Sequence, residues 1–179
     1  MENMNNILGR NKSLILNLKL PKKLEGSEEG RKLLMVLSRH ISPVKPGFKI
    51  LLPSFPLSES IIKALYAARR TGRLSRGIED AEKKLAAERA GIAFADMKTG
   101  ADRTERLSRV AVVANDGSER FYRQTKKIIE FNKPRVMAVH LDITSFELGE
   151  RLFGPGKRVL FLLLNHKDAV TGFLMSLID

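Results

Sequence analysis

The chain has 179 residues, no cysteine and a formal net charge of +12. This length is enough to bury a core, and the lack of cysteine excludes disulfides, thiolate zinc sites and cysteine nucleophiles. A hydrophobic content of 43% excludes a chain that is disordered by composition. A protein this basic is typical of polyanion binders, among which nucleic-acid binders are the commonest.

The sequence has no apolar run near the roughly 18 residues that a membrane span needs. The longest such run, 159–164, has the length of a strand, and residues 1–13 lack the apolar stretch of a signal peptide. The three histidines are far apart and match no metal-binding spacing. We therefore expect a cytoplasmic protein with no membrane association, no bound metal and no cofactor.

Residues 1–57 differ in composition from the rest. They hold ten basic and four acidic residues, about twice the net charge per residue of 58–179. Partial alternation predicts a strand over 14–20, and an apolar stripe predicts a helix over 31–41. The proline-rich segment 42–58 predicts extended chain with one short strand. We interpret this part as a basic N-terminal extension or a small α+β subdomain.

From Ser58 onward, helical and strand patterns alternate. Apolar stripes and capping residues predict helices over 58–72, 78–90, 117–133, 144–154 and 167–178. Apolar runs rich in valine and leucine predict strands over 109–116, 135–142 and 157–165, and a polar stretch predicts a long loop over 91–106. This alternation predicts an α/β domain over 58–179, a three-layer α-β-α sandwich.

The first candidate site lies at the start of the helix over 78–90. Four arginines precede it within eight residues: Arg69, Arg70, Arg73 and Arg76. Gly77 leaves room for a ligand backbone, and the free N–H groups of a first helical turn attract phosphate, which Arg73 and Arg76 would also contact. Glu79 and Asp80 can accept hydrogen bonds from bases. This mixture favours structured RNA, and the alternative is an ordinary helix start whose acids compensate the dipole.

The second candidate site is the start of the short helix, at Ile143, Thr144 and Ser145. Its hydroxyl and N–H groups could meet another phosphate or a base, although a plain N-cap is the alternative. Ser118 is interpreted as an N-cap, and His140 as a surface or rim histidine, because no catalytic spacing surrounds either of them. We therefore expect no enzymatic activity.

Three stretches in order, ALYAARRTGRLSRGIEDAEKKL, RVAVVANDGSE and RVMAVHLDITSFELGERLFG, resemble the kink-turn RNA-binding ribosomal-protein family of the L-seven-Ae and L-thirty-e type. The small bacterial ribosome-associated members are the most similar. The resemblance covers residues 58–179 and implies an α-β-α sandwich around a mixed, roughly four-stranded sheet. It also implies a short extra strand at Arg73–Arg76.

The resemblance implies RNA contacts at both candidate sites. The family motif Gly-x-Asn-Glu-x-x-Lys is matched by Gly77 and Lys83, with Asp80 in place of glutamate and Glu79 in place of asparagine. Lys84 follows directly. The second family contact corresponds to Ile143–Ser145. Residues 1–57 match no part of the family pattern.

We expect a non-catalytic RNA-binding protein that recognises structured RNA, ribosomal or kink-turn-like, within a ribonucleoprotein. One alternative is a protein–protein adaptor on the same fold, because a fold does not fix function. The other is the RNA-recognition part of an RNA-modifying system.

Overall fold

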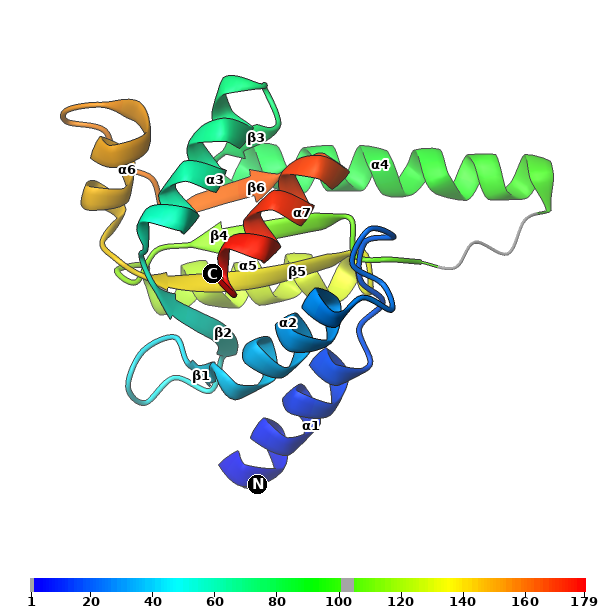
Figure 1. Ribbon diagram of the computed structural model, residues 1–179, viewed down its shortest axis with the longest axis horizontal. Helices are drawn as coiled ribbons and strands as arrows, with labels where there is room; N and C mark the ends of the chain where they lie inside the picture. Colours follow the sequence, from blue (N-terminus) through cyan, green and yellow to red (C-terminus); the bar gives the residue numbers. More distant parts are fainter. Residues whose placement is uncertain (1, 101–104) are drawn as a thin grey trace.

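A computed structural model describes residues 2–100 and 105–179 (Figure 1). The strands of the sheet are β1 (Ile41–Pro43), β2 (Leu51–Pro56), β3 (Leu74–Arg76), β4 (Arg109–Val113), β5 (Val136–Asp142) and β6 (Phe161–Leu164). The helices are α1 (Met4–Leu16), α2 (Glu28–Arg39), α3 (Glu59–Arg70), α4 (Ile78–Thr99), α5 (Glu119–Phe131), α6 (Ser145–Phe153) and α7 (Lys167–Ser176). The expected α/β class is confirmed.

The six strands form one open, mixed sheet in the order β1-β2-β5-β4-β6-β3. The pairs β2–β5 and β5–β4 are parallel, whereas β1–β2, β4–β6 and β6–β3 are antiparallel. The expectation of about four strands is therefore wrong in number, because β1 and β2 add to the sheet. Residues 51–56 include two prolines, which supply no N–H for strand pairing and make this segment resemble a linker.

Two apolar layers flank the sheet. Strand β4 alternates its side chains, so Val110 and Val112 face one layer while Ala111 and Val113 face the other. The first layer is completed by α2, α3, α6 and α7, and the second by α4 and α5 (Figure 1). This arrangement brings α4 and α6 to opposite faces of the sheet.

Part of residues 1–57 packs into the same core and sheet as the rest of the chain. Leu33 and Leu37 of α2 and Phe55 of β2 belong to the same apolar cluster as Val139 of β5. The pairing of Ser54 with His140 in parallel register joins β2 directly to β5. Helix α1 lies next to α2 (Figure 1), and none of its residues is buried, although Ile15 near its end packs against this layer.

Two sequence-based elements are wrong. No strand forms over 14–20: residues 14–16 are the last residues of α1, and residues 17–20 form neither helix nor strand. The spacing of Ile7, Leu14 and Ile15 in α1 fits a helical period better than a strand period. The long loop expected over 91–106 is helical as far as Thr99, because its alanines and charged residues allow α4 to continue past its last buried residue. Residues 101–104 lie outside the described part of that loop.

Three other helices begin at the capping residues that the sequence predicts. The side chains of Ser58, Ser118 and Thr144 cap α3, α5 and α6, each accepting a hydrogen bond from a first-turn N–H. The hydroxyl of Thr144 also donates to the Glu147 carboxylate at 3.0 Å. Across the described residues, no helix is both long and apolar enough to traverse a bilayer.

Candidate nucleic-acid interface

Three helices begin at the same edge of the sheet, the side of Figure 1 where α6 lies. Antiparallel pairing sets Arg76 opposite Leu162, so β3 ends where β6 begins. The strands β4 and β5 end at this edge as well, because Val113 pairs with both Phe161 and His140. We name residues 76–80, 115–118 and 142–145 the helix-start edge. The fold therefore brings both sequence-predicted sites to one side of the molecule.

The start of α4 differs from every other described helix start. Gly77 is its N-cap and offers no side-chain acceptor, whereas a side chain caps each of the other six helices. Gly77 has a φ of 99°, which residues with a side chain rarely adopt, and its N–H donates to the Phe161 carbonyl at 2.9 Å. The first-turn N–H groups of α4 are consequently left for solvent or a ligand.

The two acidic residues at the start of α4 also lack partners among the described residues. Glu79 and Asp80 are exposed, and neither takes part in an ion pair or a side-chain hydrogen bond with the described residues. Lys83, one turn along α4, is exposed in the same way. Lys84 differs, because its Nζ donates to the Ser75 hydroxyl at 2.8 Å and so lies against β3. Four of the predicted residues, Gly77, Glu79, Asp80 and Lys83, thus remain available at the edge.

The structure separates the two arginines expected to form one rim. Arg73 lies at the far end of β3, where its carbonyl accepts from the Asn165 N–H and its guanidinium is 3.5 Å from Asp168. Three residues of strand put Arg73 and Arg76 about 10 Å apart along the chain. Arg73 therefore contributes to the start of α7 and not to the start of α4.

Arg76 stays at the helix-start edge, but an aromatic ring holds its side chain. Its guanidinium carbon lies 5.0 Å from the centre of the Phe153 ring at the end of α6. Arg69, at the end of α3, approaches the same ring at 5.1 Å. Neither arginine has a carboxylate within 4.0 Å or a side-chain hydrogen bond among the described residues. Both guanidinium groups are thus positioned by contact with a ring while their N–H groups remain unpaired.

The second predicted site is mostly occupied by the protein itself. Ile143 is buried in the apolar layer, and Ser145 is fully buried. Asp116 accepts from both the N–H and the hydroxyl of Ser145 at 2.8 Å, and Arg158 donates to the same hydroxyl at 3.0 Å. Thr144 is used as the cap of α6. These three residues therefore shape the edge and offer few free polar groups to a ligand.

Sequence reasoning missed the contacts that fix α6 against this edge. A side chain at Gly149 would meet the Lys157 carbonyl at 2.3 Å, so only glycine lets the 154–160 loop lie against the helix. The Val159 N–H donates to the Ser145 carbonyl at 2.8 Å and closes that loop. The glycine in the ELG pattern at 147–149 indicates a close approach to the helix, although only the structure identifies the contacting loop.

His140 is not the surface or rim histidine that the sequence suggested. It is 4% exposed, and its Nδ1 lies 2.7 Å from the Ser54 hydroxyl. Its Nε2 has no hydrogen-bond partner among the described residues. Burial lowers the pKa of His140, and the nearby Asp142 carboxylate offsets part of that effect. Its position on the parallel neighbour of β2 could not be inferred without knowing that β2 joins the sheet.

The described residues contain no group of three or more histidine or acidic side chains that could hold a metal ion. Comparison of the sequence with models of protein families and with curated proteins found no match.

Proposed function

We propose that this protein binds structured RNA without catalysis, through the helix-start edge and the arginines beside it. The observation that carries the proposal is the uncapped start of α4, which has unpaired N–H groups and exposed acceptors and directly follows the unpaired Arg76 in the chain. Phosphate would take the N–H groups and the guanidinium, and Glu79 and Asp80 would accept from base amino groups. The net charge of +12 supplies the long-range attraction.

We also infer membership of the kink-turn RNA-binding ribosomal-protein family. What supports this is the mixed α/β sheet and the short strand β3 (Leu74–Arg76) within the expected segment Arg73–Arg76, although the sheet has six strands where the resemblance implies about four. Glu79 is the main departure, because an asparagine can both donate and accept whereas a carboxylate only accepts. We infer a cytoplasmic location and a ribonucleoprotein as the setting, with ribosomal or kink-turn-like RNA as the ligand.

The experiment is a gel-shift titration with a stem-loop RNA that contains one kink-turn, in about 50 mM salt. Arg76→Glu should weaken binding by about tenfold or more, because a guanidinium beside the phosphates becomes a carboxylate. Lys127→Glu, which makes the same change in charge, is the control. Lys127 is exposed and has no ion pair among the described residues, and it lies in the later turns of α5, away from the helix-start edge. Absence of binding by the unmodified protein would overturn the proposal.

A protein–protein adaptor is a second candidate, favoured by the free end of α4. Phe94 is 61% exposed and Met97 is 85% exposed, on a helix that extends beyond the body of the fold (Figure 1). Exposed apolar residues on a projecting helix suit a protein partner better than an RNA. The titration with the unmodified protein discriminates, because only the first function predicts that the kink-turn stem-loop binds.

A further inference from the structure

We propose that a row of aromatic and arginine side chains on α3, β3 and α6 stacks unpaired nucleobases, which extends the RNA site beyond the helix-start edge. The row consists of Tyr66, Arg69, Phe153 and Arg76, and we name it the stacking row. The inference rests on the proposed function and adds to it a class of ligand, single-stranded nucleotides next to a folded RNA.

The row is continuous in space although its members are far apart in sequence. Arg69 lies 6.0 Å from the centre of the Tyr66 ring and 5.1 Å from that of Phe153, so one guanidinium bridges two rings. Arg76 approaches the Phe153 ring at 5.0 Å and connects the row to Gly77. A path of stacked groups therefore leads from the start of α4 across the end of α6 to the outer surface of α3.

The outer end of the row is open to a ligand. Tyr66 is 44% exposed, which is unusual for a large ring that could pack inward, and Arg69 beside it is exposed. The other tyrosine, Tyr122, is fully buried and its hydroxyl donates to the Ala114 carbonyl. The fold thus uses one tyrosine in its core and leaves the other on the surface with an arginine against it.

The chemistry of the row matches nucleotides more closely than other anions. A nucleobase stacks on an aromatic ring or on the plane of a guanidinium, and each such contact contributes about 1–3 kcal/mol without regard to base identity. Arg69 and Arg76 lie over the Phe153 ring and make no ion pair or side-chain hydrogen bond among the described residues, so their N–H groups are free for the phosphates that link the bases. A site for free phosphate would not need the exposed ring.

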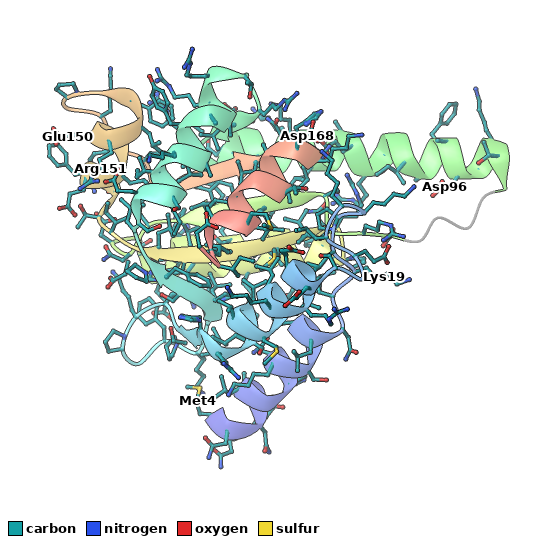
Figure 2. All side chains as sticks on the ribbon, in the orientation of Figure 1. Met4, Lys19, Asp96, Glu150, Arg151 and Asp168 are labelled. Carbon is teal, nitrogen blue, oxygen red and sulfur yellow. The ribbon has the colours of Figure 1, made fainter. Side chains whose placement is uncertain are left out.

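The local charge supports an anionic ligand. Lys63 and Arg70 are exposed on α3 beside the row and have no ion pair among the described residues. Glu59, the one acid in α3, lies at its start and is 3.7 Å from Arg151 of α6. Figure 2 places Arg151 and Glu150 on α6, at the outer side of the fold. The surface around Tyr66 is therefore positive.

The experiment compares two RNA probes on the full chain. One is the kink-turn stem-loop with blunt ends, and the other carries an added single-stranded tail of six nucleotides with 2-aminopurine in the tail. The fluorescence of 2-aminopurine falls when the base stacks. We expect the tail to tighten binding by about tenfold and its fluorescence to be quenched on binding.

Substitutions then assign the effect to the row. Tyr66→Ala should remove the quenching and most of the gain from the tail, whereas Tyr66→Phe should keep both because it keeps the ring. Arg69→Lys keeps the charge but not the planar group, and it should lose part of the quenching. Phe131→Ala is the control, because Phe131 is a 73% exposed ring on α5, on the opposite face of the sheet. Tyr66 is exposed, so thermal melting should be unchanged in both of its variants.

The outcomes separate the two proposals. If the protein binds the blunt probe and the tail adds neither affinity nor quenching, the stacking row is wrong while RNA binding stands. If the tail is quenched equally in Tyr66→Ala and in the unmodified protein, the row is also wrong. If neither probe binds, the proposed function itself fails.

Discussion

At the scale of single residues, the burial of His140 links stability to pH. Its pKa is lowered mainly by burial, so the unfolded chain, with an ordinary pKa near 6.5, takes up a proton more readily than the folded protein does. The free energy of unfolding is therefore unaffected by His140 above about pH 6.5. Below that pH, protonation of His140 in the unfolded chain lowers the free energy of unfolding, by no more than about 1.4 kcal/mol per pH unit.

His140→Gln should remove this dependence. Chemical unfolding at pH 7.5, 6.0 and 5.0 would give the free energy of unfolding of both proteins. We expect the gap between them to change towards acid pH, with the unmodified protein losing more stability. Parallel curves would show that His140 titrates alike in the folded and unfolded chains.

A second residue-scale prediction concerns Gly149. Because an added Cβ would lie 2.3 Å from the Lys157 carbonyl, Gly149→Ala should lower the free energy of unfolding by about 1–3 kcal/mol. Gly91→Ala is the matched control, since Gly91 is exposed in α4 and nothing lies near its added Cβ. That variant should be neutral or more stable by up to about 1 kcal/mol. Equal effects of the two substitutions in a urea titration would contradict the packing described for α6.

At the scale of elements, the buried residues of α4 lie only in the first part of the helix. Ala81 and Leu85 are its buried residues, and Glu88 holds Arg109 at 3.1 Å and Arg135 at 3.3 Å, so the first three turns are attached to the sheet. The turns beyond Arg89 have no buried residue. A helix without tertiary packing is only marginally stable in water.

Amide hydrogen exchange should show this division. We expect residues 92–99 to exchange on the order of 100-fold faster than residues 81–88, with α5 as a packed reference helix. Equal protection along the whole of α4 would mean that a second molecule covers its far end in solution.

At the scale of the whole molecule, the sequence predicted the part of the fold that local patterns encode. The alternation from Ser58 onward is confirmed, and so is a helix within 31–41, although that helix spans Glu28–Arg39 and Ile41 begins β1. Caps and apolar stripes specify these elements locally. The pairing of β2 with β5 could not be predicted, since a proline-rich strand is recognised only by its partner. The same limit applies to His140, whose burial depends on that pairing.

The local features of the candidate site could be predicted from the sequence, but its contacts between distant residues could not. The glycine and acids at the start of α4 could be identified from spacing alone, because an N-terminal turn is a local feature. The separation of Arg73 from Arg76 follows from the direction of β3 between them. The ring of Phe153, which positions Arg69 and Arg76, comes from a helix more than 70 residues further along the chain, and no local pattern marks it.

The salt dependence of RNA binding tests the central proposal most directly. Affinity for the kink-turn stem-loop would be measured between about 50 and 200 mM salt for the unmodified protein and for the double variant Arg69→Glu, Arg76→Glu. We predict that log K falls steeply with log salt and that the slope becomes shallower by about 2 in the double variant, one unit for each lost phosphate contact. Identical slopes for the two proteins would contradict the account, as would no binding at the lowest salt.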